Sequence, residues 1–250
     1  MKTVLTIAGS DPSGGAGIQV DLTTFHSLGV HGMSAITAIT AQNAKRFFSL
    51  NPVSSRLLRE QLQSIVGTHP IHAIKIGILG TEENVVAVYR FLESIQKDEK
   101  APKVVLDPVF KSSTGSILLE PKGVAILSQF MIPLSTIVTP NLEEAELLTK
   151  MKVRSVEQMK EAALHLHVVH KGVKAVLIKG GHLKDEATDV LYDGRDWKLF
   201  LAKRKYARDV HGTGCALSAA IAAHLARGYS LEKSVERSKE FVTDYIHLRA

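Results

Sequence analysis

The chain has 250 residues, 45% of them hydrophobic and 22% charged, and a formal net charge of +6; its mean hydropathy of +0.06 is typical of a soluble globular protein. Its single cysteine excludes an intramolecular disulfide framework and favours a reducing compartment. No stretch approaches the roughly 18 uninterrupted apolar residues of a membrane span, and the apolar run before Gly9 is too short for a signal peptide. We therefore expect a cytoplasmic protein without a membrane partner.

Apolar runs of strand length alternate with helical patterns along most of the chain. The runs are nearly continuous Val, Ile, Leu and Ala, as expected of parallel strands covered on both faces, and they span residues 3–9, 33–40, 72–79, 103–109, 135–140 and 174–181. Helical patterns lie between them, near residues 16–28, 54–67, 82–98, 142–150 and 155–172. This alternation predicts an α/β fold with a doubly wound, mostly parallel sheet in a single domain, residues 1–250.

The segment ATDVLYDGRDWKLFLAKRK (187–205) departs from this alternation. Two strand-like runs flank Asp193-Gly194, which is a turn signal, and predict a small antiparallel hairpin near a sheet edge. Two helices are predicted after it, about 212–227 and 230–248. Gly228 is placed to end the first of these and Ser230 to cap the second.

Polar residues and glycines follow the predicted strands. In open α/β sheets, ligands bind beyond the carboxyl ends of the strands. The residues at those positions are Gly9, Ser10, Asp11, Gln42, Asn43, Gly77, Asp107, Asn141, Lys179, Gly180 and Gly181. The sequence therefore predicts a binding site along this edge of the sheet.

The turn GSDPSGGAG (9–17) joins the first strand to the first helix, where backbone N–H groups can face a ligand. It matches neither the phosphate-binding loop nor a complete dinucleotide fingerprint, so a purely structural tight turn is equally consistent. Asp21 falls inside the apolar stripe of the helix that follows, where a carboxylate is costly unless it is paired or hydrogen-bonded. We interpret Asp21 as facing a ligand; the alternative is a solvated edge of the stripe.

Three further strand ends carry candidate phosphate or metal groups. Asn141 and Glu144 have the spacing of a helix cap, and the same pair could hold hydrated Mg²⁺ beside a phosphate. Lys179 stands beside two glycines and is a candidate phosphate-binding ammonium. Asp107 is a candidate neighbour of a metal or phosphate, although it could simply cap a turn. The eleven histidines form no zinc motif, and those of HLHVVH (165–170) spread around a helix, so we expect no zinc site.

The stretch HGTGC (211–215) opens a predicted helix of small residues. Gly212, Thr213 and Gly214 would direct backbone N–H groups outward at the positive end of the helix dipole, which suits negative charge on a transferring group. At that position we expect the thiol pKa of Cys215 to be lowered, so that a thiolate could take a proton from a substrate hydroxyl. The small residues after Cys215 are interpreted as close packing on the sheet.

Taken in order, seven segments resemble the hydroxymethylpyrimidine/phosphomethylpyrimidine kinases of thiamine biosynthesis, in the ribokinase-like superfamily. They are LTIAGSDPSGGAGIQVDL, GMSAITAITAQN, KIGILG, VVLDPV, TPNLEEAELL, IKGGH and HGTGCALSAAIAAHLA, and they cover most of the chain. The resemblance implies a three-layer α/β/α fold and ATP-dependent phosphorylation of a hydroxymethyl group and then of the resulting monophosphate. The chain departs from the pattern of this family at 44–50 (AKRFFSL) and at Ser116, where an aspartate is common.

The resemblance also implies a role for each candidate residue. The pyrimidine ring would be held by Ala16, Asp21, Gln42, Ile78 and Val109. The ATP phosphates would lie near Asp107, Asn141, Glu144, Lys179 and Thr213, with Mg²⁺ reached through water at Glu144 and Asn141. Gly212, Thr213 and Gly214 would form the anion hole, with Lys179 beside it and Cys215 as the base. A homodimer is implied as well, and activation by a monovalent cation is left open.

Three alternatives remain at this stage. A pyridoxine/pyridoxal kinase is the nearest, although Gln42 in TAQN fits the pyrimidine kinases better. A non-catalytic pyrimidine- or nucleotide-binding protein would have no need to keep Lys179, Asn141 and Glu144 together. The pI of about 9.3 admits nucleic acid, but the basic residues are scattered, with only AKRKYAR (202–208) dense, and no groove-reading motif is present. We therefore expect a small-molecule partner and no nucleic acid.

Overall fold

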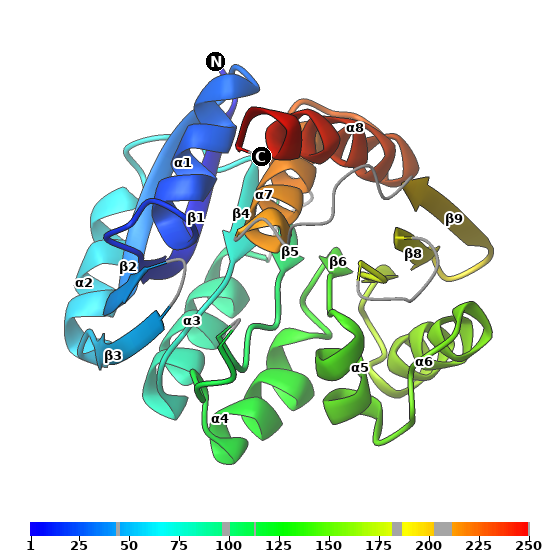
Figure 1. The fold of residues 1–250 in the computed structure, drawn as a ribbon. Coiled ribbons are helices and arrows are strands. Elements are labelled where there is room, and N and C mark those ends of the chain that lie inside the picture. The colour runs from blue at the N-terminus through cyan, green and yellow to red at the C-terminus, as the bar shows by residue number, and fades with distance from the viewer. Residues whose placement is uncertain (44–45, 97–100, 113, 182–186, 203–211, 250) are drawn as a thin grey trace.

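One β-sheet runs through the middle of the molecule and carries helices on both faces (Figure 1). The structure is a computed structural model that describes residues 1–43, 46–96, 101–112, 114–181, 187–202 and 212–249. Within these residues, nine strands lie in the order β3-β2-β1-β4-β5-β6-β7-β8-β9. Their bounds are β1 Thr3–Ser10, β2 His31–Asn43, β3 Arg46–Pro52, β4 Ala73–Ile76, β5 Lys103–Leu106, β6 Ile137–Val138, β7 Ala175–Ile178, β8 Ala187–Tyr192 and β9 Trp197–Ala202.

The interior strands are parallel and the two edges are antiparallel. β2, β1, β4, β5, β6 and β7 pair in parallel, so their carboxyl ends share one edge of the sheet. β3 pairs antiparallel with β2 at one side, and β8 and β9 form the antiparallel hairpin at the other. From β1 the chain continues to β2 on one side and reaches β4 on the other, which makes the β1–β4 boundary the topological switch point.

The helices form two outer layers, as the two hydrophobic clusters of the core require. Val4 and Val105 face the layer that contains α1, α7 and α8, whereas their neighbours Leu5 and Val104 face the layer of α2 to α6 (Figure 1). This alternation explains why the strands read as continuous apolar runs. The helices are α1 Gly17–Ser27, α2 Ser55–Ile65, α3 Glu82–Ile95, α4 Pro121–Ile126, the π-helical turn η1 Leu127–Met131, α5 Leu142–Thr149, α6 Val156–Val169, α7 Thr213–Ala226 and α8 Leu231–Arg249.

Helix α7 is built mostly of small residues and packs directly on the sheet. It contacts β1, β4 and β5 on one side, and α1 and α8 on the others. Every residue from Ala216 to Ala226 is buried, and alanine side chains permit this close approach at no cost in side-chain entropy. The buried core of α7 fixes its amino end over the carboxyl ends of β4 and β5.

The sequence prediction of a three-layer α/β/α fold with an antiparallel edge hairpin is confirmed, but three details differ. β3 was missed because most of its side chains are exposed and it carries no apolar run. The predicted strands 72–79 and 103–109 end at Ile76 and Leu106, because the apolar residues after them are buried or half-buried without belonging to the sheet. Helix α4 and η1, between β5 and β6, were also not predicted.

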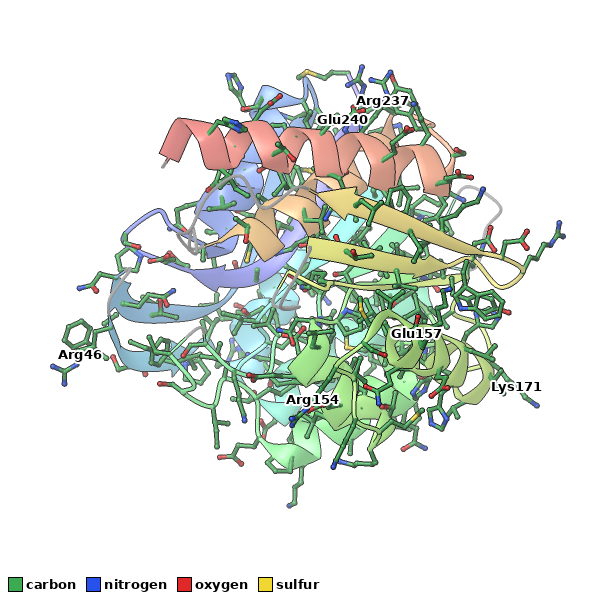
Figure 2. The ribbon with its side chains drawn as sticks, turned by 45° about the vertical axis from the view of Figure 1, so that its right-hand side comes forward. Arg46, Arg154, Glu157, Lys171, Arg237 and Glu240 are labelled. Atoms are coloured by element: carbon green, nitrogen blue, oxygen red, sulfur yellow. The ribbon has the colours of Figure 1, made fainter. Side chains whose placement is uncertain are left out.

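Charges of both signs are distributed over the surface. Figure 2 labels Arg237 with Glu240 on α8 and Arg154 with Glu157 near the start of α6, while Arg46 lies on β3 at the far side. The basic run 202–208 falls almost wholly outside the described residues. Among the described helices, none is both long and apolar enough to cross a membrane.

Candidate active site

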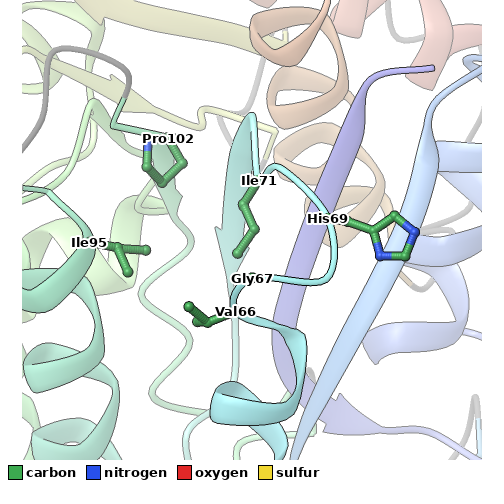
Figure 3. Close-up of a pocket in the computed structure, with 6 residues that line it drawn as sticks. All are labelled: Val66, Gly67, His69, Ile71, Ile95 and Pro102. Carbon is green, nitrogen blue, oxygen red and sulfur yellow. The ribbon is translucent and has the colours of Figure 1, made fainter.

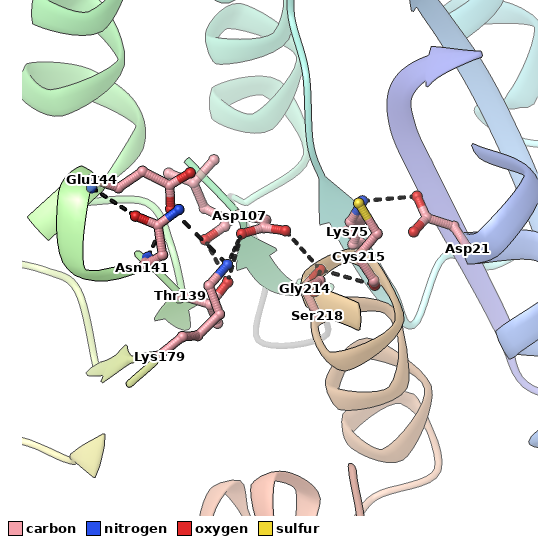
Figure 4. Close-up of polar contacts among 11 residues, drawn as sticks. Asp21, Lys75, Asp107, Thr139, Asn141, Glu144, Lys179, Gly214, Cys215 and Ser218 are labelled. Carbon is pink, nitrogen blue, oxygen red and sulfur yellow. Dashed lines mark hydrogen bonds and ion pairs between the residues drawn. The ribbon is translucent and has the colours of Figure 1, made fainter. Parts of the chain in front are cut away.

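The carboxyl ends of β5 and β7 meet the amino end of α7 at Asp107, which is 1% exposed (Figure 4). Its Oδ1 accepts a hydrogen bond from Lys179 Nζ at 2.6 Å and a longer one from Thr139 Oγ1 at 3.3 Å. Its Oδ2 accepts a hydrogen bond from Ser218 Oγ on α7 at 3.1 Å. The carboxylate therefore holds a lysine and a helix in fixed relation, which is the preorganisation that electrostatic catalysis needs.

Lys179 directs its ammonium between the acidic side chains and the start of α7. Its backbone bridges to Asn141, and its Nζ lies 4.0 Å from Glu144 Oε2. A Cβ added at Gly214 would come within 3.5 Å of that Nζ, so the ammonium lies beside the first turn of α7. Burial alone lowers the pKa of Lys179, but the carboxylates of Asp107 and Glu144 outweigh it and raise the pKa, which keeps the side chain charged.

Asn141 and Glu144 form the helix cap that their spacing predicts. Asn141 Oδ1 accepts from the Glu144 N–H at 2.8 Å, and Glu144 Oε2 accepts from the Asn141 N–H at 2.7 Å, at the start of α5. Burial raises the pKa of Glu144 to about 7, against the opposing charge of Lys179. The cap fixes the carboxylate at the strand-end edge, and within the described residues no cluster of three or more acidic, His or Cys side chains forms a metal site.

The amino end of α7 begins at a residue in the left-handed conformation. Gly212 has φ +86°, and a Cβ there would lie 1.8 Å from the carbonyl oxygen of Gly15 in the turn after β1. The first hydrogen bond of the helix runs from the Ala216 N–H to the Gly212 carbonyl at 2.9 Å. The N–H groups of Thr213, Gly214 and Cys215 precede it and form the positive end of the helix.

Cys215 is partly buried at this helix end. The expectation of a lowered thiol pKa is wrong: burial raises the pKa of Cys215, although the positive charge of Lys75 and the nearby backbone N–H of Gly17 oppose the rise. The helix dipole and the glycines could be read from the sequence. The burial of the sulfur by α1 and the sheet could not.

Asp21 is fully buried and has a partner that sequence reasoning missed. Its Oδ2 accepts from Lys75 Nζ at 2.9 Å and from Thr6 Oγ1 at 2.6 Å. Its Oδ1 is buried without a hydrogen-bond partner in the described part of the chain. The signal for Lys75 was a lysine in the middle of the apolar run HAIKIGIL, which a solvated surface lysine would not occupy.

The remaining candidate residues lie along the same edge of the sheet. Ala16 is the residue before α1, and Gln42 lies near the end of β2 opposite Phe47. Ile78 follows β4, and its carbonyl accepts the hydroxyl of Thr37. Val109 follows β5, with its N–H bonded to the Asp107 carbonyl. Their contacts with a ring stay predictions.

A shallow apolar hollow lies away from these groups, at the opposite edge of the sheet (Figure 3). It is lined by Val66, Gly67, His69, Ile71, Ile95 and Pro102. Ile71 precedes β4 and Pro102 precedes β5, so the hollow faces the amino ends of the strands. It offers few polar groups and is not the site that the charged residues form.

Solved structures define the class of protein first. The chain matches the crystal structure of phosphomethylpyrimidine kinase from Clostridium difficile with a TM-score of 0.85 and 38% identity, covering 98% of this chain and 100% of the other. It matches pyridoxal kinase from Staphylococcus aureus, solved in complex with AMP-PCP and pyridoxal, with a TM-score of 0.86 and 36% identity over 97% and 87% of the two chains. The fold is that of a ribokinase-like kinase.

Sequence comparison defines the family. The phosphomethylpyrimidine kinase model matches residues 11–250. The hydroxymethylpyrimidine/phosphomethylpyrimidine kinase of Rhizobium meliloti is 42% identical over 239 residues, which are 95% of this chain and 88% of that protein. The thiamine biosynthesis bifunctional protein ThiED of Geobacter sulfurreducens is 38% identical over 98% of this chain, which spans 49% of that longer protein. The chain belongs to the phosphomethylpyrimidine kinase family.

Proposed function

We propose that this protein uses ATP to phosphorylate 4-amino-5-hydroxymethyl-2-methylpyrimidine and then phosphorylates the monophosphate to the diphosphate, for thiamine biosynthesis. The observation that carries the proposal is the Lys179 ammonium, held by Asp107 at 2.6 Å beside the first turn of α7. Two positive features, a lysine and a helix amino end, converge there on the strand-end edge. That arrangement suits the charge that builds up on a phosphoryl group during transfer.

In the proposed reaction, the hydroxyl oxygen of the substrate attacks the γ-phosphorus and the bond from that phosphorus to ADP breaks. The N–H groups of Thr213 and Gly214, with Lys179, stabilise the charge on the transferring group. Cys215, as the thiolate, takes the hydroxyl proton. Positioning and charge neutralisation supply most of the acceleration in such transfers.

Mg²⁺ fits the acidic side of this site. Glu144 presents a fixed carboxylate 4.0 Å from Lys179, and Mg²⁺ typically binds one or two carboxylates together with substrate phosphates and water. Glu144 would hold the ion through water, with Asn141 fixing the orientation of the carboxylate. The metal would neutralise charge on the ATP phosphates.

The pyrimidine ring is proposed to bind across the ends of β1, β2 and β4. The buried Oδ1 of Asp21 is an acceptor for the exocyclic amine, and the amide of Gln42 can pair with a ring edge. Ile78 and Val109 would contact the ring faces, with Ala16 contributing its backbone. An unpartnered buried carboxylate oxygen is costly, and a donor from the ligand would remove that cost on binding.

The test is ADP release with Mg-ATP and, in parallel, hydroxymethylpyrimidine, its monophosphate and pyridoxal. We expect release with both pyrimidines, and its absence with both would overturn the proposal. Two variants separate the roles. Cys215→Ala should lower kcat about 10²-fold with little change in pyrimidine affinity, because it removes the base. Gln42→Ala should raise KM first, and equal losses of affinity in both would refute the assignment of the base.

Pyridoxal phosphorylation is the second candidate activity. It rests on the likeness to the S. aureus pyridoxal kinase over 97% of this chain, at 36% identity. Both substrates are flat heteroaromatic rings with a hydroxymethyl group. The pyridoxal arm of the same assay measures it.

We propose further that the protein works in the cytoplasm as a homodimer. A cysteine that accepts a proton as the thiolate has to stay reduced, and the cytoplasm is a reducing compartment. Sedimentation velocity at micromolar concentration tests the dimer, which would appear as a species of twice the 27.2 kDa chain mass.

A further inference from the structure

Lys75 is a lysine inside the sheet, 1% exposed in the centre of β4. Burying an ammonium costs several kcal/mol, and a buried ion pair is weak evidence for stability, since apolar residues of the same volume often serve as well. Within the described residues, the ion-pair partner of this lysine is Asp21, at 2.9 Å. A pair of this kind, next to a proposed active site, calls for a reason beyond stability.

The pair lies at the switch point of the sheet, beside the amino end of α7, which packs on β4 and α1 (Figure 4). A Cβ added at Gly77, the residue after β4, would come within 3.0 Å of Lys75 Nζ, so the ammonium reaches the carboxyl end of the strand. Gly17 and Asp21 are four residues apart and therefore lie on one face of α1. The same face of α1 offers the Asp21 carboxylate to Lys75, and Figure 4 shows Cys215 next to this pair.

We propose that Lys75 is a positioning residue of phosphoryl transfer, whose ammonium, held in place by Asp21 and Thr6, is the counter-charge for the Cys215 thiolate. This inference rests on the proposed function of Cys215 as the base. It assigns to the Lys75–Asp21 pair an electrostatic role on the sulfur that is separate from any contact of Asp21 with the substrate.

The charged groups around the sulfur come from four elements. Lys75 approaches from β4, Asp21 from α1, Asp107 from the end of β5 and Lys179 from the end of β7. Burial raises the pKa of the thiol most strongly, Lys75 lowers it, and Asp21 and Asp107 raise it. The two partners of one ion pair therefore act on the thiol in opposite directions.

The opposite effects of Lys75 and Asp21 on the thiol pKa should change the reaction rate, because the thiolate is the proposed proton acceptor. The thiolate accepts the proton of the substrate hydroxyl while the oxygen forms its bond to the γ-phosphorus and ADP leaves. The thiol then releases that proton to water before the next turnover. At a pH below the thiol pKa, the rate is proportional to the fraction of thiolate, which Lys75 increases and Asp21 decreases.

The experiment measures the rate of alkylation of the intact protein by iodoacetamide against pH, read by mass. Cys215 is the only cysteine, so the midpoint of the pH curve belongs to that residue alone. We expect Lys75→Met to move the midpoint upward by about one pH unit and Asp21→Asn to move it downward by about one unit, the size of effect that a nearby charge produces. At a pH below the midpoint these shifts correspond to about tenfold slower and tenfold faster alkylation.

Lys239→Met is the matched control, because it breaks a different ion pair, between Lys239 and the buried Asp189 at 2.7 Å, and should leave the midpoint where it is. Shifts of the same sign in both Lys75→Met and Asp21→Asn, or no shift in either, would overturn the proposal. If Lys75→Met does not fold, the near-isosteric Asp21→Asn decides by itself: a downward shift supports the proposal and an unchanged midpoint refutes it.

Turnover of the same variants separates this inference from the proposed function. Alkylation requires no substrate, so opposite shifts of the midpoint establish the counter-charge even if no pyrimidine is phosphorylated. Where ADP release is observed, the rise of kcat with pH should move with the alkylation midpoint in Lys75→Met. If kcat of Lys75→Met keeps the wild-type dependence on pH while its alkylation midpoint is displaced, the thiol is not the base.

Discussion

At the scale of single residues, buried charges hold one another in position before a ligand binds. Asp107 is bonded through both oxygens, to Lys179 and to Ser218, and Glu144 is fixed by the Asn141 N–H. A carboxylate held in this way cannot swing to a new partner, so the lysine it orients is available to a phosphate without reorganisation. The energetic cost of burying these groups is offset by their mutual pairing.

His224 on α7 is a further buried titratable residue, and it makes the free energy of unfolding depend on pH. Burial lowers its pKa to about 4, with Arg227 and Arg237 adding to the effect. In the unfolded chain His224 has the ordinary histidine pKa of about 6.5, so between pH 4 and 6.5 the unfolded state binds a proton that the folded state does not. The free energy of unfolding therefore rises as the pH increases from 4 to 6.5, and His224 adds no pH dependence above that. We expect a contribution of about 3 kcal/mol across this window.

Urea unfolding at pH 4.5, 5.5, 6.5 and 7.5 measures this dependence. His224→Phe should flatten the slope because it removes the group that takes up the proton. The exposed His26 provides the control, and His26→Phe should leave the slope unchanged. An unaltered slope in His224→Phe would assign the pH dependence to other residues.

At the scale of elements, the start of α7 depends on one glycine. Gly212 combines φ +86° with a Cβ position only 1.8 Å from the Gly15 carbonyl oxygen, whereas Gly228, at the other end of the helix, has φ +90° and open space around it. Gly228→Ala should lower the free energy of unfolding by ~1 kcal/mol because of its backbone conformation, and Gly212→Ala should lower it clearly more. Gly212→Ala should also lower kcat by about tenfold or more, because the start of α7 shifts.

Thermal unfolding and ADP release of the two alanine variants test this difference. Equal melting temperatures and equal turnover in the two variants would mean that the turn after β1 can move aside. The comparison is sharp because both glycines flank the same helix and have nearly the same φ.

The elements also show why some features could be predicted and others could not. The apolar runs of β1, β4, β5 and β7 and the capping pair Asn141–Glu144 are local patterns, and local patterns can be read from the chain. β3 has no such pattern because most of its side chains are exposed. Lys75 was visible as an anomaly, but its partner Asp21 lies 54 residues away, and only the fold brings the two together.

At the scale of the whole molecule, one sheet runs through the described elements, and the single domain expected for residues 1–250 stays a prediction that cooperative unfolding tests. Trp197, the only tryptophan, lies on β9 at the edge farthest from β3. We expect unfolding in urea followed by tryptophan fluorescence and by far-ultraviolet circular dichroism to give coincident curves. Separate midpoints would indicate that the hairpin edge unfolds independently.

The thiol shows the limit of prediction at this scale. Its place at a helix amino end suggested a low pKa, and that reasoning was sound for the helix alone. The surroundings reverse the direction, because α1 and the sheet remove water from the sulfur. A pKa reflects everything that packs around the group, so it is the property of a site least accessible to sequence.

The contact between Gly212 and the turn after β1 has a consequence for how such a chain can diverge. Gly15 comes from the segment that would enclose the ring of the acceptor, and Gly212 from the segment that would receive the phosphoryl group. Because the two backbones touch without an intervening side chain, neither loop can gain or lose a residue without displacing the other. New acceptor specificities should therefore arise by substitutions around the ring, at positions such as Gln42, while both loops keep their lengths.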